Sequence, residues 1–513
     1  MAHAAKVIPN LYRDSISLMQ LSAALATLPG VDGVSAVMAT PANLALLAEA
    51  GLERGSIAAG PNDLLITLRG RSAAALEAAL ATAVADLDQP PPAADSGAPG
   101  QMPPRSLQMG LAQVPDANLA LISTPGEYAA AEAMKALRLG LNAMLFSDNV
   151  ELREEIELKR YAQARDLLVM GPDCGTAIIN GIPLGFANAV RRGAVGVVGA
   201  SGTGTQQVTC LVHRHGAGIS HAIGTGGHDL HRDVGGITML QGIRALAADD
   251  ATKTIVLVSK PPSPEVAQTV LDEAMRCGKP VVVNFIGAAP GSIRGRNLHA
   301  ATTLEHAALC AVALARGRKP PGAKAAALPP PRVGRMASSQ RYVRGLYSGG
   351  TFCYEACALM GASLGDVWSN APVDPRLRLA NVRKSKGHTL IDLGDDEFTR
   401  GRPHPMIDFR LRNERILKEA ADPEVAVILI DVVLGFGAHP DPAAELVPVI
   451  EKARAAARRT RRNIAFLGFV CGTELDPQGL ERQEHALRGA GMILAASNAQ
   501  AVRLAVMIAG KRR

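Results

Sequence analysis

The sequence contains the same pattern twice. In each copy an apolar strand runs into a turn of small residues and then into a helix. The first copy reads Val195-Gly-Val-Val-Gly-Ala-Ser-Gly-Thr-Gly-Thr, and the second reads Gly345-Leu-Tyr-Ser-Gly-Gly-Thr-Phe-Cys. The next segments also correspond, because Ile223-Gly-Thr-Gly-Gly-His-Asp is matched by Ile391-Asp-Leu-Gly-Asp-Asp-Glu. A repeat of this length indicates a duplicated domain.

Short apolar runs alternate with helical segments through most of the chain, a pattern typical of α/β proteins with a buried parallel sheet. We predict two tandem flavodoxin-like doubly wound domains, preceded by a partial Rossmann-like unit and a small α+β N-terminal domain of ferredoxin-like outline. The predicted parts are the small domain at 1–88, a Pro/Ala-rich linker at 89–107, the partial unit at 108–190, the first repeat at 191–316, a linker at 317–337 and the second repeat at 338–513.

Composition narrows the classes of function. The aromatic content of 3% argues against a nucleic-acid surface built on base stacking. The net charge of +7 lies partly in clusters such as Arg458-Arg459-Thr-Arg-Arg, which are typical of solvated helix ends, and a mild positive bias also suits a small anionic substrate. No signal peptide and no apolar stretch of membrane-spanning length is apparent. We expect a cytoplasmic protein with no nucleic-acid or membrane partner.

The seven cysteines show no paired framework. Cys353 and Cys357 lie four residues apart on a predicted helix, but no Cys-x-x-Cys motif or nearby His pair completes a metal site. Core thiols in a reducing compartment are the favoured interpretation, and no metal is predicted.

The two small-residue turns are candidate anion sites. Each follows an apolar strand and begins a helix, where unpaired N–H groups and the helix dipole favour an anion. The alternative is a helix cap and tight turn without a ligand. A Walker motif is absent, as is a dinucleotide fingerprint with its acidic partner. The candidate phosphate-binding residues are Ser201, Gly202, Thr203, Gly204, Ser348, Gly349, Gly350 and Thr351.

The next loops also carry polar residues and should lie beside the turns on the same sheet edge. A His could act as acid or base, and Asp side chains could orient a polar substrate. The alternative is that Asp and Gly simply form these turns. The candidate catalytic residues are His228, Asp229, Asp395 and Asp396, and the candidate substrate-binding residues are Gly226, Gly227, Arg402 and His404.

Several phrases resemble the FdrA/YahF-type acyl-CoA synthetase family of the succinyl-CoA synthetase superfamily. They include Gly171-Pro-Asp-Cys-Gly-Thr-Ala-Ile-Ile-Asn-Gly, Val258-Ser-Lys-Pro-Pro and Asp395-Asp-Glu-Phe-Thr-Arg-Gly-Arg-Pro-His-Pro-Met-Ile-Asp. The resemblance covers nearly the whole chain. It implies that 108–190 is part of a CoA-binding-type domain and that both repeats are ligase-CoA-type domains.

In succinyl-CoA synthetase, two helix N-termini hold a phosphohistidine. By resemblance, Ser201-Gly-Thr-Gly begins the α-type phosphate helix and Ser348-Gly-Gly-Thr the β-type one. The Gly-His-Ala-Gly loop of that family is missing; His299 is the nearby histidine, and it is not expected to take the phosphohistidine role. The nucleotide-binding ATP-grasp domain is also missing. The resemblance therefore argues against ATP or CoA as a cofactor of this chain alone.

FdrA-type proteins act beside partner subunits in oxamate carbamoyltransferase. The resemblance therefore implies a transferase subunit that forms carbamoyl or acyl phosphate from a small ureido or carboxylic acid, with phosphate as substrate. One alternative is an acyl-CoA synthetase subunit that needs a partner for the nucleotide. Another is a non-catalytic subunit that binds phosphate for regulation. The expected partners are a small anionic substrate and the other subunits of an FdrA-type operon, in an oligomer.

Overall fold

The computed structural model describes residues 1–52, 58–88, 104–324, 327–399 and 403–510. The chain divides into two compact units. Unit 1 comprises 1–151 with 396–408, and unit 2 comprises 152–395 with 409–513. No helix within the described ranges is both long and apolar enough to cross a membrane.

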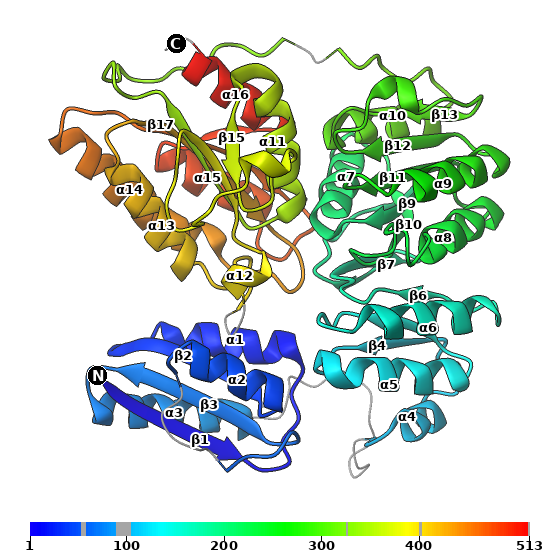
Figure 1. The fold of residues 1–513 in the computed structure, drawn as a ribbon, viewed down its shortest axis with the longest axis horizontal. Helices are drawn as coiled ribbons and strands as arrows, with labels where there is room; N and C mark the ends of the chain where they lie inside the picture. Colours follow the sequence, from blue (N-terminus) through cyan, green and yellow to red (C-terminus); the bar gives the residue numbers. More distant parts are fainter. Residues whose placement is uncertain (53–57, 89–103, 325–326, 400–402, 511–513) are drawn as a thin grey trace. The chain divides into compact units, whose positions relative to one another are not determined.

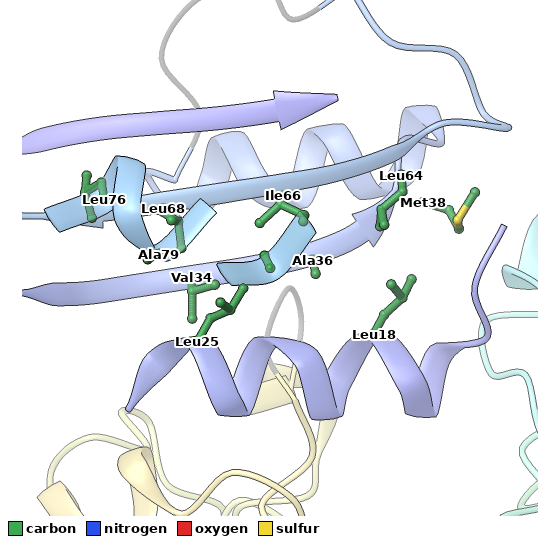
Figure 2. Close-up of a cluster of buried hydrophobic side chains, with 11 residues drawn as sticks. Leu18, Leu25, Val34, Ala36, Met38, Leu64, Ile66, Leu68, Leu76 and Ala79 are labelled. Carbon is green, nitrogen blue, oxygen red and sulfur yellow. The ribbon is translucent and has the colours of Figure 1, made fainter. Parts of the chain in front are cut away.

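The N-terminal domain of unit 1 is an antiparallel sheet covered by helices (Figure 1). Strand β3 lies between β1 and β2, which confirms the predicted small α+β domain. Alternate residues of β3, Leu64, Ile66 and Leu68, pack on the core that includes Leu18 and Leu25 of α1 (Figure 2). The elements are β1 (Ala2–Ile8), α1 (Ser15–Ala26), β2 (Val31–Met38), α2 (Pro41–Glu49), β3 (Leu64–Gly70) and α3 (Ala73–Asp88).

The remainder of unit 1 contains a small parallel βαβ arrangement in which β4 pairs with β5. Helix α5 lies between the two strands in the sequence and packs on both of them. The elements are α4 (Leu107–Gln113), β4 (Leu119–Ile122), α5 (Gly126–Arg138), β5 (Asn142–Leu145) and the short α12 (Asp396–Thr399).

The first sheet of unit 2 has the order β13-β12-β11-β9-β10-β7-β8. Its strands from β13 to β10 are parallel, and the β7–β8 hairpin adds an antiparallel edge. The elements are α6 (Leu152–Gln163), β6 (Val169–Met170), β7 (Thr176–Ile179), β8 (Ile182–Gly185), β9 (Arg192–Ala200), α7 (Gly202–Arg214), β10 (Ile219–Gly224), α8 (Ile237–Ala248), β11 (Thr254–Ser259), α9 (Pro264–Arg276), β12 (Val281–Phe285), β13 (Leu298–Ala300) and α10 (Leu304–Ala315).

The second sheet of unit 2 is fully parallel and has the order β15-β16-β14-β17-β18-β19. All nine residues of its central strand β17 are buried, as expected for a strand covered on both faces. The elements are β14 (Tyr342–Tyr347), α11 (Gly350–Leu364), β15 (Val367–Ser369), β16 (His388–Asp392), α13 (Arg410–Ala421), β17 (Val425–Val433), α14 (Pro442–Arg459), β18 (Ala465–Cys471), α15 (Leu480–Gly489), β19 (Ile493–Ala495) and α16 (Asn498–Gly510).

The two sheets repeat one topology. The order β10-β9-β11-β12-β13 in the first corresponds to β16-β14-β17-β18-β19 in the second, and both follow the flavodoxin-like pattern. The predicted pair of doubly wound domains is confirmed. Helices α7 and α10 of the first copy contact α11 and α16 of the second, so the two copies pack through one helical layer each (Figure 1).

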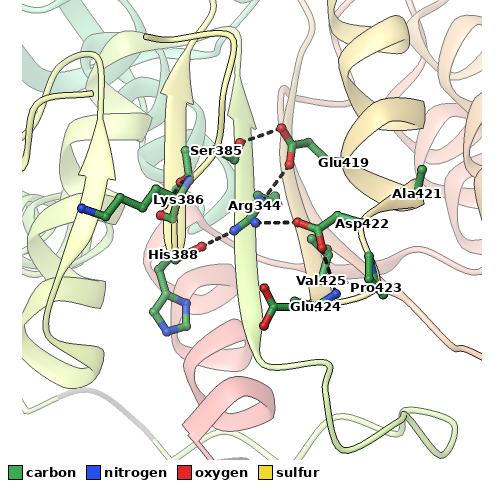
Figure 3. A network of polar contacts seen from close by, with 12 residues as sticks. Arg344, Ser385, Lys386, His388, Glu419, Ala421, Asp422, Pro423, Glu424 and Val425 are labelled. Carbon is green, nitrogen blue, oxygen red and sulfur yellow. Dashed lines mark hydrogen bonds and ion pairs between the residues drawn. The ribbon is translucent and has the colours of Figure 1, made fainter. Parts of the chain in front are cut away.

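A buried polar network fixes α13 against the second sheet (Figure 3). Arg344 of β14 is 3% exposed, and its Nε donates to Glu419 at 2.8 Å while its Nη2 donates to Asp422 at 2.9 Å. Ser385 Oγ donates to the other Glu419 oxygen at 2.6 Å. Because each carboxylate has a charged or hydroxyl donor, the network avoids an uncompensated buried charge.

Candidate functional site

The first turn begins α7 directly after β9. Ser201 is the N-cap in extended conformation, and its Oγ accepts a hydrogen bond from Gly204 N at 3.1 Å. Gly202 is exposed, whereas Thr203 and Gly204 are buried. The first residue of the helix therefore presents its backbone to solvent at the end of the dipole that attracts anions.

The second turn begins α11, but its serine has a different place. Gly349 is the N-cap and has no side chain to cap the helix. Ser348 lies one residue earlier, and its N and Oγ both donate to the Asp431 carboxylate at 2.8 Å. Gly349 N donates to the same carboxylate at 2.9 Å. The second turn thus binds an anion that the chain itself supplies.

Backbone register shows the offset between the copies. Thr225 N donates to Gly199 O, and Leu393 N makes the matching bond to Tyr347 O. Gly199 therefore corresponds to Tyr347, so Ser201 corresponds to Gly349 rather than to Ser348. The same register places Val258, the β11 partner of Gly199, where the second copy has Asp431. The first turn has an apolar residue where the second has its carboxylate.

The two helix starts meet. Ser201 Oγ lies 2.6 Å from Thr351 Oγ1, so the hydroxyls share a hydrogen bond. A Cβ on Gly204 would lie 3.0 Å from Thr351 Cγ2, and one on Gly349 would lie 2.9 Å from Thr203 Cγ2. Glycine at these positions allows the close approach. The two candidate anion turns lie together, with side chains of both in direct contact.

Asp392, at the end of β16, adds a carboxylate beside the second turn. A Cβ on Gly350 would lie 2.4 Å from Asp392 Oδ2, so residue 350 must be glycine for the helix start to reach the acid. Burial raises the pKa of Asp392 to about 6, although the charge of Lys260 opposes the shift. Lys260 follows β11 of the first copy, and its Nζ lies 6.0 Å from the Tyr354 ring of α11. A carboxyl group with this pKa can exchange a proton near neutral pH.

Asp431 is held from its other side by Arg412. The guanidinium of this α13 residue donates through Nη1 to the Asp431 carboxylate at 3.0 Å and to the Asp431 carbonyl oxygen at 2.8 Å. Arg412 is 1% exposed and Asp431 is fully buried. The pair therefore relies on hydrogen bonds to compensate the loss of solvation.

Asp229 is enclosed in a second buried network. Its carboxylate accepts from Thr238 N at 3.1 Å and Met239 N at 2.9 Å, at the start of α8, and from Lys159 Nζ at 2.8 Å. Lys159 also donates to Glu155 at 2.7 Å. Because these donors already occupy its carboxylate, Asp229 is placed to hold its loop in position rather than to contact a substrate.

His228 lies at the surface of that network. Its Nδ1 is 3.4 Å from Glu155 Oε2, and the side chain is 55% exposed. The hydrogen bond to Glu155 raises the pKa of His228, with burial opposing the shift. Burial acts to raise the pKa of Glu155, but His228 and Lys159 together lower it. His228 is thus an oriented and accessible imidazole.

The neighbouring glycines have packing roles. Gly226 has φ +85°, and a Cβ there would lie 2.2 Å from Pro172 O. Gly227 is less restricted, since its Cβ would lie 3.5 Å from Asp173 Oδ2. Both belong to the loop that follows β10.

The other predicted site residues lie elsewhere. Asp395 is the last residue of the segment 152–395 of unit 2, whereas Asp396 and His404 belong to unit 1. Arg402 lies outside the described residues. His299 is in the edge strand β13 opposite Val282, where burial lowers its pKa.

Sequence reasoning missed Asp392, Asp431, Arg412 and Lys260. Asp392 ends the apolar run of β16, and Asp431 interrupts the apolar run of β17. An acid in an otherwise buried strand is a signal that could have identified both residues. Arg412 and Lys260 gave no such signal, because charged residues on a helix or after a strand are usually solvated.

Comparison with known proteins supports the resemblance. The chain is 44% identical over 497 residues to YahF of Escherichia coli (strain K12), covering 96% of this chain and 95% of that protein. The chain belongs to the FdrA/YahF-type family. This family is part of the succinyl-CoA synthetase superfamily. The chain is also 30% identical over 193 residues to the succinate–CoA ligase [ADP-forming] subunit alpha of Staphylococcus aureus (strain N315). That match covers 35% of this chain and 60% of the relative.

Family models match three segments of this FdrA/YahF-type chain. A CoA-ligase model matches 346–508, a CoA binding domain model matches 190–287, and the AllF heavy metal-associated domain model matches 1–103. Among solved structures, the dinucleotide forming acetyl-coenzyme A synthetase 1 of Ca. Korarchaeum cryptofilum, in complex with phosphate and ADP, is 15% identical with a TM-score of 0.35, covering 82% of this chain and 88% of that one.

The name of the N-terminal family implies a heavy metal, but the residues do not fit one. Residues 1–103 contain no cysteine, and His3 is their one histidine. Soft metals prefer thiolate and imidazole ligands. Within the ranges that the structure describes, no group of three His, Cys, Asp or Glu residues is arranged to hold a metal ion.

Proposed function

We propose that the chain transfers an acyl group between a small acid and phosphate, and that the acyl phosphate is carbamoyl phosphate when the acid is a ureido acid. The observation that carries this proposal is the meeting of α7 and α11, whose starts share the 2.6 Å contact between Ser201 and Thr351. The start of α7 offers exposed backbone at Gly202 to an anion, and the start of α11, whose turn already bonds Asp431, adds its helix dipole beside it.

The chemistry needs little beyond binding and electrostatic support. A phosphate oxygen attacks the ureido carbonyl carbon, the bond from that carbon to the leaving nitrogen breaks, and the nitrogen takes a proton. The products are carbamoyl phosphate and an amine, which is an amide where the leaving nitrogen carries an acyl group. Negative charge that develops on the carbonyl oxygen is stabilised by fixed N–H donors, which the exposed start of α7 at Gly202 provides.

Two further residues suit this reaction. Asp392, with a pKa of about 6, can hold the proton that the leaving nitrogen requires. Lys260 brings a positive charge from the first copy toward Asp392 of the second, and it can also attract an anionic substrate.

The test is to incubate the purified chain, alone and with the partner subunits of its operon, with a ureido acid and phosphate. Formation of carbamoyl phosphate supports the proposal. Gly202→Leu should reduce the rate at least tenfold by covering the exposed helix start, whereas Gly361→Ala should not, because open space surrounds Gly361 in α11. Full activity of Gly202→Leu would remove the helix start from the mechanism.

A second candidate is a CoA ligase subunit, favoured by the CoA-ligase and CoA binding domain matches. Adding CoA and ATP with a partner subunit would then give a thioester.

A third candidate is a non-catalytic phosphate-binding subunit, favoured by the occupation of the second turn by Asp431. Phosphate binding without either product would support that candidate.

A further inference from the structure

Unit 2 contains a small pocket, of about 120 Å³, that none of the proposed chemistry uses. It is lined by the residues around the starts of β18 and β19, by the end of α14 and by the segment before β14. Three arginines belong to the lining, namely Arg332 of that segment and Arg454 and Arg458 of α14. We call this space the arginine pocket.

The arginine pocket lies at the sheet edge opposite the start of α11. Strands β14, β17 and β18 are parallel, and α11 follows the carboxyl end of β14. The pocket instead adjoins the amino ends, at Ala465 of β18 and Ile493 of β19. Reacting ligands of α/β folds usually bind at the carboxyl edge. The position of the arginine pocket therefore suits a ligand other than the reacting substrate.

The positive charge of the arginine pocket has no counter-charge from the chain. No Asp or Glu is among the described residues of the lining. In the part of the chain that the structure describes, none of the three arginines forms an ion pair. Like charges around so small a space repel one another, so a bound anion would be stabilised there.

An apolar wall strengthens this effect. Met336, Ile464 and Ala465 line the same space, and each is at most 7% exposed. Apolar surroundings lower the local dielectric, which makes the attraction between a guanidinium group and an anion stronger than in water. The pocket thus combines unpaired positive charge with a partly desolvated floor.

The two arginines of α14 are held by backbone acceptors. They lie four residues apart, on one face of the helix. Arg454 Nη1 donates to Ala490 O, and its guanidinium lies against Gly491, where a Cβ would overlap Arg454 Nη1. Arg458 Nε donates to Arg454 O at 3.4 Å. Because this bond uses Nε alone, the two Nη groups of Arg458 remain for a ligand.

The segment that carries Arg332 is fastened to the start of β18. Asn463 Nδ2 donates to Arg335 O at 2.5 Å, and Gln340 Nε2 donates to Asn463 O at 2.7 Å. A Cβ on Gly334 would lie 3.0 Å from Asn463 Nδ2, so the segment packs closely on that side chain. The third arginine is therefore placed beside the other two by specific contacts.

We propose that the arginine pocket is an effector site that binds a phosphate group, either free or carried by a small organic molecule. Guanidinium forks match phosphate oxygens in pairs, and a phosphate group has more acceptor oxygens to share among three arginines than a carboxylate has. Pockets that enclose a whole drug-sized ligand usually hold about 300–1,000 Å³, so this one suits a head group. Arg332 and Arg458 are exposed, so the remainder of an ester can extend into solvent.

The test is calorimetric titration of the full chain at constant, low ionic strength. The Gly202→Leu variant is used throughout, so that the proposed reaction site contributes as little as possible. The probes are inorganic phosphate, glycerol 3-phosphate and acetate. We expect one or both phosphate probes to bind, and acetate to bind at least tenfold more weakly. Tighter binding of glycerol 3-phosphate identifies an ester as the ligand, and tighter binding of inorganic phosphate identifies the free ion.

Matched variants locate the binding. Arg454→Gln and Arg458→Gln should each weaken it at least tenfold, whereas Arg459→Gln, an exposed change on α14 outside the lining, should change it less than twofold. Arg458 is exposed, so its variant should fold even if Arg454→Gln does not. Equal losses in Arg458→Gln and Arg459→Gln would show only the diffuse charge of a solvated helix end. That result, unchanged binding in both lining variants, equal binding of acetate, or no binding of either phosphate probe would overturn the proposal.

Discussion

At the scale of single residues, Asp431 supplies the carboxylate that accepts the donors of the turn before α11. Three donors of the turn, Ser348 N, Ser348 Oγ and Gly349 N, bond to its two oxygens. The first turn has Val258 at the corresponding position. The duplicated turns therefore differ in the group that their donors meet, because only the second turn has a carboxylate of the chain at this position.

Asp431→Asn should destabilise the fold strongly. The change leaves the Arg412 guanidinium, 1% exposed, without its charge partner. Breaking a buried ion pair in this way typically costs about 3–5 kcal/mol. Urea unfolding of both proteins measures the difference. The double variant Asp431→Asn/Arg412→Met should recover part of the loss, and a loss of less than about 1 kcal/mol in the single variant would contradict this account of the pair.

Asp392 should make stability depend on pH. Its pKa rises from 3.8 to about 6 on folding, mainly through burial. The native state therefore holds this proton more tightly, so the contribution of Asp392 is most favourable below pH 4 and is lost as the pH rises to about 6. The size of this effect is about 3 kcal/mol. Relative to the native protein, Asp392→Asn should thus gain up to about 3 kcal/mol between pH 4 and pH 7 in urea unfolding. A difference between the two proteins that does not change with pH would show that Asp392 ionises normally.

At the scale of elements, the start of α7 distinguishes two neighbouring glycines. A Cβ on Gly204 would lie 2.4 Å from Ser201 Oγ and 3.0 Å from Thr351, whereas one on Gly202 meets nothing closer than Thr176 Oγ1 at 3.4 Å. Gly204→Ala should therefore displace the cap and cost about 1–3 kcal/mol. Gly202→Ala should change stability by less than about 0.5 kcal/mol. Thermal or urea unfolding of the two variants makes the comparison, and similar losses in both would argue against contact between the helix starts.

The strand and helix pattern could be predicted from sequence because apolar runs and their bounding residues are local signals. The resemblance assigned the two turns to the helix starts that hold one phosphohistidine, and the structure brings Ser201 and Thr351 of these starts into contact. The one-residue offset between Ser201 and Ser348 could not be predicted. Both serines precede a glycine and suit a cap, and only the strand register shows that Gly349 occupies the cap position.

The buried charged residues were harder to predict from the sequence than the strands and helices. Glu155 and Lys159 lie four apart on a helix, as solvent-exposed ion pairs often do, and nothing local indicates that both are buried against Asp229. Asp229 was accordingly predicted to be catalytic from its loop alone. Such pairings depend on contacts between residues about 70 positions apart, which a single sequence does not reveal.

At the scale of the whole molecule, polar bonds join the two sheets of unit 2. Asp476, after β18, accepts from Ala189 N and from Asn188 Nδ2, each at 2.8 Å, in the segment before β9. Thr473 Oγ1 donates to Ala189 O at 2.5 Å. With the contacts of α7 and α10 against α11 and α16, these bonds indicate that the duplicated domains form one cooperative structure.

Asp476→Ala should therefore destabilise both copies of the duplicated domain. The change leaves the N–H groups of Thr473, Ala189 and Asn188 without their acceptor, and each unsatisfied buried donor costs about 1–3 kcal/mol. Hydrogen exchange should accelerate at the start of β9 as well as at the end of β18, because the lost bonds hold the segments that adjoin these two strand ends. Asp374→Ala is the control, since Asp374 pairs with the exposed Arg376 and should leave exchange unchanged in both strands. Acceleration confined to β18 would mean that the copies open independently, and the two helix starts would then lack the shared rigid support that joint binding of phosphate and acid requires.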